Sequence, residues 1–241
     1  METKLLYLKD FSALSCEARV IAVARENEKD AVALDATVFY PQGGGQPYDT
    51  GMIESPAGKL IVEEVRFADG AVRHIGRFER GGFSAGDTVQ CRVDAQRRML
   101  HSRIHSAGHL LDWAITELEP AWTPDPRGYH YPNGPYVTYA GGLEGRDKEK
   151  LKTDLEAACN RRIAMGGEVG VRFMNQEEMK TICRSMPDLP EGKSGRVIMF
   201  GEDFGVPCGG THIKNLSEIR ILTIRKIKQE GSNIRVGYDM V

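Results

Sequence analysis

The feature that most constrains the fold of this chain is a pair of short motifs that lie far apart in the sequence. Three histidines, His101, His105 and His109, follow one another at intervals of four residues, and Cys208-Gly-Gly-Thr-His212 begins 99 residues after His109. Four residues is just over one helical turn, so neighbouring histidines of the series share one face of a helix. If both motifs bind one ion, the fold has to assemble the site, unlike a compact zinc finger.

The residue types of the two motifs favour zinc. Cysteine and histidine are the usual ligands of Zn²⁺, and two histidines four residues apart on a helix can converge on one ion. Glycines between Cys208 and His212 let the chain fold tightly there. Each motif alone has a plainer reading, as separate hydrogen-bonded histidines or as a buried cysteine in a tight turn. Together they predict one zinc ion per chain, but the spacing does not decide whether His101 takes part.

The sequence lacks the motifs of several other enzyme classes and of secreted or membrane proteins. Ser106, Ala107 and Gly108 separate His105 from His109, so no glutamate stands where a zinc protease has its base. No Gly-x-Ser-x-Gly elbow is present. The five cysteines are scattered and odd in number, which is not a disulfide framework and predicts a reducing, cytoplasmic location. The N-terminus has no secretory pattern, and no run approaches the roughly 18 apolar residues that span a membrane.

Charge limits how this chain can meet nucleic acid. With 32 Lys and Arg against 34 Asp and Glu, the net charge is only −2. Bulk attraction to a phosphate backbone is therefore excluded, and any RNA contact needs a local basic face. The length of 241 residues fits one large domain or two small ones.

The first part of the chain, residues 1–93, is typical of a small β-barrel or sandwich. Short segments alternate apolar and polar residues between Gly, Pro and Asp signals. The candidate strands are residues 5–8, 17–24, 32–36, 59–66, 71–75 and 88–93. A glycine-rich motif, Tyr40-Pro-Gln-Gly-Gly-Gly-Gln-Pro-Tyr-Asp-Thr-Gly51, interrupts the strands, and its successive glycines free the backbone for positive φ.

The pattern changes at Asp94, the predicted N-cap of a helix over residues 96–118. A loop rich in Pro and Gly follows at 120–135, and a second helix is predicted at 147–165. Asn175 and Glu178 predict a capping box for a third, short helix. Further strands are expected at residues 168–174, 196–200, 218–228 and 233–238, with a hairpin turn at Gly231-Ser232. The second part is therefore mixed, with a largely antiparallel sheet.

Together, the motifs resemble a known family. His105-x-x-x-His109 followed by Leu110-Leu111, with Cys208-Gly-Gly-Thr-His212 further on, is similar to the editing domain of alanyl-tRNA synthetases and of threonyl-tRNA synthetases. Residues 34–51 resemble the glycine-rich segment that precedes that domain, and 210–219 follow the family pattern. No segment is long enough for a class II aminoacylation domain. The chain therefore resembles the freestanding alanyl-tRNA editing proteins, the AlaX group.

The resemblance implies a fold, an activity and a ligand set. The fold would be α+β, with a β-barrel domain at 1–93 that carries the glycine-rich motif and a zinc-binding editing domain at 94–241. The activity would be ATP-independent hydrolysis of the ester between alanine tRNA and a wrong amino acid, chiefly serine or glycine. The partner would be the acceptor end of that tRNA, with no membrane involved. The implied zinc ligands are His105, His109, Cys208 and His212.

The expected chemistry is metal-assisted hydrolysis at the 3′ end of the tRNA. Zinc lowers the pKa of bound water to about 7, so zinc-bound water is the expected nucleophile and no side chain is assigned as the catalytic group. Catalytic zinc normally has three protein ligands, whereas this chain offers four. We therefore expect one ligand, Cys208 or His212 on the glycine turn, to be loose, or the ion to become five-coordinate when substrate binds.

The positions of some residues relative to the two motifs suggest which of them contact the substrate and the tRNA. The candidate substrate-binding residues are Gly209, Gly210 and Thr211, which lie between two ligands, and Gln46 of the glycine-rich motif. Thr211 has two readings, a hydrogen bond to a serine hydroxyl or a cap on the turn. The candidate tRNA-binding residues are Arg97, Arg98 and Arg103. A second basic cluster lies towards the end of the chain, at Lys214, Arg220, Arg225, Lys226, Lys228 and Arg235. Either cluster can equally be a solvated charged face.

Two other functions remain open at this point. The same site would serve a deacylase for another aminoacyl-tRNA, and the loop at 124–139 is unlike the synthetase version, which bears on the amino acid removed. The four-ligand count also suits a non-catalytic, zinc-stabilised RNA-binding module. Oligomeric state is not readable from the sequence.

Overall fold

The computed structural model describes residues 2–190 and 192–241 and divides into two compact units, Met1–Leu100 and His101–Val241. The division falls inside the long helix α1 (Ala95–Leu118). The sequence-based boundary after residue 93 lies at the start of this helix and stays a prediction. Among the described residues, no helix combines the length and the apolar character needed to span a lipid bilayer.

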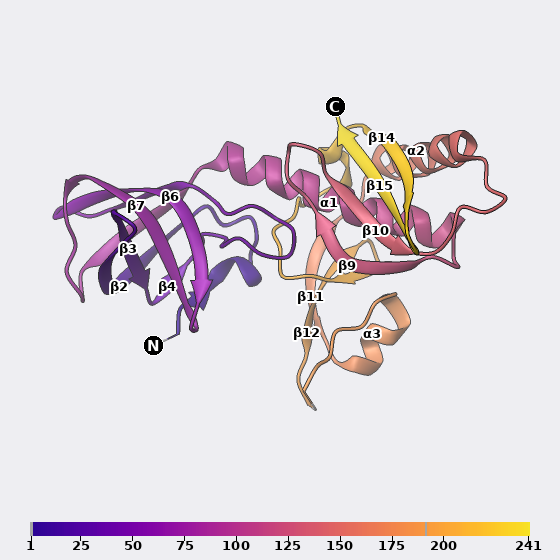
Figure 1. Ribbon diagram of the computed structural model, residues 1–241. Coiled ribbons are helices and arrows are strands. Elements are labelled where there is room, and N and C mark those ends of the chain that lie inside the picture. Colours follow the sequence, from indigo (N-terminus) through magenta and orange to yellow (C-terminus); the bar gives the residue numbers. More distant parts are fainter. Residues whose placement is uncertain (1, 191) are drawn as a thin grey trace. The chain divides into compact units, whose positions relative to one another are not determined.

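The first unit is a closed, antiparallel β-barrel (Figure 1), which confirms the predicted α+β fold with an N-terminal barrel. Around the barrel the strands follow the order β2, β3, β7, β6, β5, β8. Their bounds are β2 (Ser15–Glu26), β3 (Lys29–Leu34), β5 (Gly51–Glu54), β6 (Gly58–Ala68), β7 (Ala71–Gly81) and β8 (Thr88–Val93). A short parallel pair, β1 (Lys4–Leu5) with β4 (Ala36–Thr37), and the 3₁₀ turn η1 (Leu6–Leu8) complete the unit.

Buried and more exposed side chains alternate along the strands, and the buried ones fill the interior of the barrel. In β8 the side chains of Val89, Cys91 and Val93 are buried, whereas the residues between them are exposed. The strands also pass one another closely where glycine is required. A Cβ on Gly76 would lie 1.8 Å from the carbonyl oxygen of Ile61. Any larger residue there would force the two strands apart.

The glycine-rich motif forms a tight turn within this unit. Gly43 and Gln46 exchange two backbone hydrogen bonds, of 3.3 and 2.8 Å. Gly44 and Gly45 between them have φ values of +51° and +75°. Two successive residues with positive φ are the requirement of a type I′ turn. The glycines therefore serve the backbone freedom that the sequence predicted for them.

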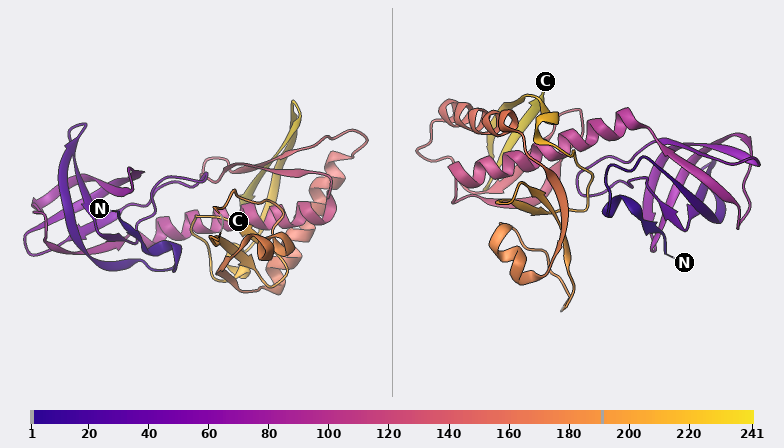
Figure 2. Two further views of the ribbon diagram at one scale, coloured as in Figure 1. Left: turned by 90° about the horizontal axis from the view of Figure 1, so that it is seen from below. Right: turned by 180° about the vertical axis from the view of Figure 1, so that it is seen from behind.

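The second unit places two helices on one face of a four-stranded antiparallel sheet (Figures 1 and 2). The helices are α1 and α2 (Lys148–Met165), and the sheet order is β14-β15-β10-β9. The strands are β9 (Thr123–Tyr129), β10 (Tyr136–Ala140), β14 (Leu222–Glu230) and β15 (Asn233–Met240). A smaller sheet and two short helices complete the unit: β11 (Val169–Met174), α3 (Gln176–Ile182), β12 (Gly195–Phe200), β13 (Gly205–Pro207) and η2 (Leu216–Ile219).

Most predicted boundaries rest on caps that the structure confirms. The Asp94 carboxylate accepts hydrogen bonds from two backbone N–H groups of the first turn of α1. Asp147 does the same for α2, and Asn175 with Glu178 forms the expected capping box of α3. Gly231-Ser232 joins β14 to β15, because Glu230 pairs directly with Asn233.

Several predicted elements were wrong. Residues 5–8 are mostly the 3₁₀ turn η1 rather than a strand, and the expected strand at 218–228 begins as η2, capped by Asn215, before β14 starts at Leu222. The supposed loop at 120–135 contains β9, in which Pro124 is tolerated because β9 lies at the edge of its sheet. The short strands β5, β10 and β13 were missed.

Candidate metal centre

The structure brings together the four side chains that the resemblance implied. The ligand atoms of His105, His109, Cys208 and His212 all lie within 4.8 Å of one another, and Cys208 Sγ is 3.5 Å from His105 Nε2. Helix α1 presents the first two side chains one turn apart. His101 lies one further turn back, buried but outside this group. That the four residues bind a metal ion stays a prediction.

Backbone contacts hold the cysteine turn in place. The Cys208 N–H donates to the Arg196 carbonyl in β12 (3.2 Å), and the Arg196 guanidinium donates back to the Cys208 carbonyl. The Gly210 N–H donates to Cys208 Sγ (3.3 Å). A backbone donor aimed at sulfur stabilises the thiolate, which is the form that binds metal.

Two histidines of the cluster are oriented by neighbours on α1. His109 Nδ1 donates to the Asp112 carboxylate (3.1 Å), whose other oxygen accepts the hydroxyl of Tyr139. His212 Nδ1 lies 3.1 Å from the Ser106 hydroxyl. Each contact fixes the ring through Nδ1 and directs Nε2 towards the cluster. A histidine that binds metal through one nitrogen typically bonds a carboxylate or similar group through the other.

One buried nitrogen is the best indication of a missing ligand. Within residues 2–190 and 192–241, no hydrogen-bond partner reaches the buried Nε2 of His109. Buried polar atoms are rarely left in that state. Because three imidazoles and a thiolate are donors that zinc accepts, the residues present fit a zinc ion.

Electrostatics act differently on the four side chains of the cluster. Burial lowers the pKa of His105 and of His212 well below the usual value, so both rings are neutral. Burial acts on His109 in the same direction, but the hydrogen bond to Asp112 and the nearby Cys208 sulfur prevail and raise its pKa to about 9. For Cys208, burial raises the pKa, yet the nearby His109 ring outweighs it and the pKa is lowered.

A fifth histidine, His130, was missed from the sequence. Its ring stacks on that of His105, with centroids 4.4 Å apart and planes 22° apart. Tyr238 donates its hydroxyl proton to the Ile104 carbonyl (2.9 Å), so it accepts from His130 Nδ1 (2.8 Å). Burial lowers the pKa of His130 to about 3. A single histidine in a Pro- and Gly-rich loop gave no spacing signal.

Two glycines make room for that ring. A Cβ on Gly108 of α1 would lie 2.6 Å from the His130 ring, and so would a Cβ on Gly128 of β9. The glycine between His105 and His109 is thus explained by the approach of the His130 ring. From the sequence alone, Gly108 indicates only that no glutamate stands between the two histidines.

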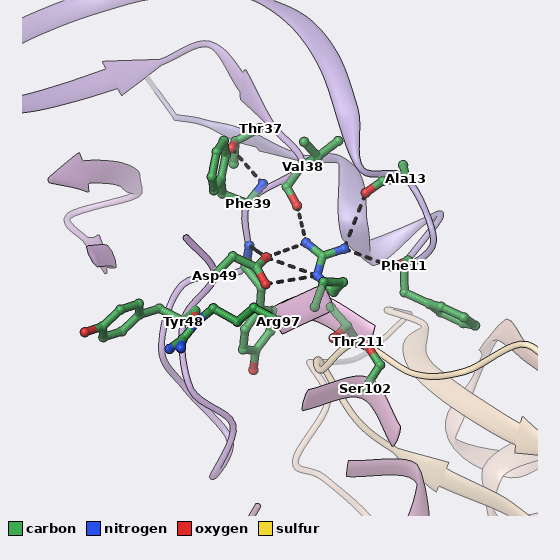
Figure 3. Close-up of polar contacts among 12 residues, drawn as sticks. Phe11, Ala13, Thr37, Val38, Phe39, Tyr48, Asp49, Arg97, Ser102 and Thr211 are labelled. Atoms are coloured by element: carbon green, nitrogen blue, oxygen red, sulfur yellow. Dashed lines mark hydrogen bonds and ion pairs between the residues drawn. The ribbon is translucent and has the colours of Figure 1, made fainter. Parts of the chain in front are cut away.

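The candidate substrate-binding residues lie in different settings. Gly209 and Gly210 lie in the turn between two cluster residues, and Thr211 is fully buried with its hydroxyl 2.8 Å from that of Ser102 (Figure 3). Gln46 is fully buried in the first unit. A role in substrate binding stays a prediction for all four.

The three candidate tRNA-binding arginines differ in exposure. Arg97 donates to the Tyr48 carbonyl (3.0 Å) and Arg103 to the Ile219 carbonyl (3.2 Å), and both are partly exposed. Arg98 is only 3% exposed and forms an ion pair with Asp49. The structure thus gives Arg98 internal contacts, and tRNA binding stays a prediction for all three arginines.

Asp112 offers a direct test of how the centre is built. Replacing it in Asp112→Asn keeps the shape but removes the charge that orients His109, so we expect metal affinity to fall about 10- to 100-fold. Competition with a chromophoric chelator measures this affinity. Asp154→Asn, at an exposed carboxylate on α2 that pairs with Lys150, is the matched control and should leave it unchanged. Equal affinities for the two variants would contradict the assigned role of Asp112.

Comparison with known proteins identifies relatives of this chain. A family model for class II (A) tRNA synthetases matches residues 3–97. An alanine–tRNA ligase of Methanothrix thermoacetophila is 31% identical over 83% of this chain, which spans only 22% of that ligase. An alanyl-tRNA editing protein AlaX-M of Methanosarcina barkeri is 31% identical, with 98% of this chain and 96% of the relative covered.

A second relative extends the match to another organism. The AlaX-M editing protein of Pyrococcus horikoshii is also 31% identical, with 95% of this chain and 92% of the relative covered. Both AlaX-M proteins are thus matched over nearly their whole length. With its barrel and its His/Cys cluster, this chain belongs to the AlaX family of alanyl-tRNA editing proteins.

Proposed function

We propose that this protein is a zinc-dependent hydrolase that removes serine or glycine from wrongly charged alanine tRNA. The observation that carries the proposal is the convergence of His105, His109, Cys208 and His212 within 4.8 Å, in a chain of this family. Ester hydrolysis uses water alone, which fits an enzyme that needs no ATP. The proposed location is the cytoplasm, in accordance with the reduced cysteines that the sequence suggests.

The side chains of the chain have separate tasks in this reaction. Bound at the cluster, Zn²⁺ supplies Lewis-acid chemistry, by activating water at neutral pH and by polarising the ester carbonyl. Asp112 holds His109, and Ser106 holds His212, so that each ring presents Nε2. The Gly210 N–H donates to Cys208 Sγ, which favours the thiolate form of the side chain.

Cys208 is the proposed mobile ligand. Four protein ligands would close a tetrahedral site, whereas a catalytic site keeps a position for water or substrate. Cys208 is partly exposed, while the three histidines of the cluster are buried. We propose that Cys208 would be the most loosely held of the four donors, leaving room for the substrate beside the three histidines.

Deacylation of charged alanine tRNA tests the function. We expect the purified protein to hydrolyse seryl- and glycyl-tRNA carrying the alanine anticodon and to spare correctly charged alanyl-tRNA. A chelator should abolish the activity, and added zinc should restore it. Failure to turn over either mischarged substrate would contradict the proposal, whereas turnover of a different aminoacyl-tRNA would point to another substrate for the same site.

A zinc-stabilised RNA-binding module is the second candidate, and the count of four ligands favours it. Such a module would bind tRNA without cleaving the ester. Chelation would then lower the melting temperature and RNA affinity together. The deacylation assay and a melting curve, each with and without chelator, distinguish the two functions.

A further inference from the structure

The four-stranded sheet of the second unit has a face directed away from its helices. Strand alternation separates the two faces: Val137 and Tyr139 in β10 are buried, whereas Tyr136 and Thr138 are partly exposed. Figures 1 and 2 show α1 and α2 on the other side of the sheet. The residues of the metal cluster lie on the helix side of the sheet. The side chains of the outer face do not belong to the cluster.

Four planar groups form a column on this outer face. The ring of Tyr129 stacks on that of Tyr131, with centroids 4.5 Å apart, and on that of Tyr136, 5.4 Å apart, each at an interplanar angle of 15°. The guanidinium of Arg235 lies 4.2 Å from the centroid of the Tyr136 ring. We call Tyr131, Tyr129, Tyr136 and Arg235 the tyrosine column. Tyr129 and Tyr136 are direct cross-strand partners, so the sheet register sets their spacing.

A cavity adjoins the end of the column at Arg235. Its volume is about 210 Å³, and its lining residues are Tyr136, Thr138, Glu230, Asn233 and Arg235. Glu230 holds the guanidinium in an ion pair of 2.8 Å. The plane of Arg235 is therefore fixed by an aromatic ring and a carboxylate, and polar side chains surround it.

The charges of the outer face suit an anionic partner that binds mainly by stacking. The register places Lys226, Lys228 and Arg235 on this face, against Asp125, Glu230 and Asp239. Arg225 joins them, because its guanidinium lies 3.0 Å from where a Cβ on Gly237 would point. Among the side chains that the structure describes, four cations against three acids is a local excess of one, in a chain whose net charge is −2. Phosphates are attracted, but this small excess alone does not supply strong binding.

The tyrosine column and the metal cluster share one segment of chain. His130 lies between Tyr129 and Tyr131 in sequence, and its ring stacks on that of His105. The same segment, within residues 124–139, is the loop that departs from the synthetase pattern. A ligand held on the column would thus be bound by residues adjacent to one that contacts the cluster.

We propose that the outer face of this sheet binds single-stranded RNA, with one unpaired base in the cavity beside Arg235 and Tyr136 and another at the opposite end of the tyrosine column, against Tyr131. Proteins read single strands by stacking bases on aromatic rings and on guanidinium planes, often across a four-stranded sheet. The parallel rings, the fixed guanidinium and the basic strands supply each part of that chemistry. The proposal rests on the proposed function in one respect, because the unpaired end of a tRNA would supply such a strand.

Fluorescence anisotropy with a labelled eight-nucleotide single-stranded RNA tests the proposal directly. We expect Tyr136→Leu, beside the cavity, and Tyr131→Leu, at the other end of the column, each to weaken binding about tenfold, the usual scale for loss of one stacking ring. Tyr136→Phe, which keeps the ring, should stay within about twofold of the parent. Arg235→Lys, which keeps the charge but not the plane, should also weaken binding.

The control is an exposed aromatic side chain outside the column. Phe173 on β11 is 56% exposed, and Phe173→Leu should leave RNA affinity unchanged. Circular dichroism melting confirms that each variant is folded. Photo-crosslinking of 5-iodouridine RNA, mapped by mass spectrometry, should mark peptides that contain Tyr129, Tyr131 or Tyr136.

Two results would overturn the proposal. One is unchanged RNA affinity in both leucine variants, which would leave the face to a protein partner. The other is equal affinity for a blunt-ended, fully paired RNA duplex, which would point to phosphate binding alone. Failure of the deacylase proposal is distinguishable, because a protein that cleaves no ester but loses RNA binding in the leucine variants still uses this surface.

Discussion

Replacing His109 in His109→Ala is expected to empty the metal centre and to slow deacylation of seryl-tRNA about a thousandfold. The expected size follows from the several kcal/mol that a Lewis acid contributes to such a reaction, at tenfold for each 1.4 kcal/mol. His109 is central because it is buried, because Asp112 orients it and because its Nε2 faces the other donors. Elemental analysis of the purified variant measures zinc, and the deacylation assay measures activity.

His101 provides the matched control for this prediction. It lies on the same helix, belongs to the same four-residue series and is buried to a similar degree, at 2% exposed against 7% for His109. It lies outside the cluster. His101→Ala should therefore retain zinc and activity, whatever it costs in stability. Equal loss of zinc in both variants would contradict the assignment of the ligands.

The comparison of these two histidines shows where sequence reasoning reached its limit. The four-residue spacing predicts one helix face for His101, His105 and His109, and the structure confirms the helix. Spacing along one helix cannot say where along its length a distant turn will pack, so only the family resemblance separated His101 from the others. The turn at Cys208 was found because its residue types are those that bind zinc.

The side chains that orient the cluster residues could not be predicted from the sequence, for a different reason. Asp112, Tyr139 and His130 are ordinary residue types, and their roles arise from packing between segments far apart in the chain. Tyr139 reaches Asp112 from β10, a strand of five residues that carries little periodic signal. The barrel, in contrast, repeats one alternation over several long strands, which is why its class could be predicted while its short strand β5 was missed.

The ion pair between Arg98 and Asp49 belongs to the same class of unpredictable contacts, and breaking it is the second large effect we expect. Arg98 donates through Nε and Nη2 to the Asp49 carboxylate, at distances of 2.5 to 3.1 Å. Its remaining donors reach the backbone carbonyls of Phe11, Ala13 and Val38 (Figure 3). Arg98 therefore ties the start of α1 to three separate segments of the first unit.

Removing one partner of this pair leaves a buried charge without compensation. Asp49 is fully buried and also accepts the backbone N–H of Tyr40 (2.7 Å), which closes the glycine-rich motif. We expect Arg98→Met to destabilise the first unit by about 3–5 kcal/mol, the usual cost of such a change. That is a large part of the 5–15 kcal/mol that stabilises a typical domain. Hydrogen-exchange mass spectrometry should detect the loss as faster exchange in residues 38–50.

Arg97 is the matched control, since it precedes Arg98 on the same helix but is partly exposed and bonds a single carbonyl, that of Tyr48. Arg97→Met should change stability by less than about 1 kcal/mol. The pair of variants also separates stability from RNA binding. If Arg98→Met kept normal exchange in residues 38–50 and lost only tRNA affinity, the internal role of Arg98 would be wrong. A different outcome would assign separate roles to the two arginines. If Arg98→Met speeds hydrogen exchange in residues 38–50, and Arg97→Met weakens tRNA binding without changing stability, then Arg98 stabilises the fold and Arg97 binds tRNA.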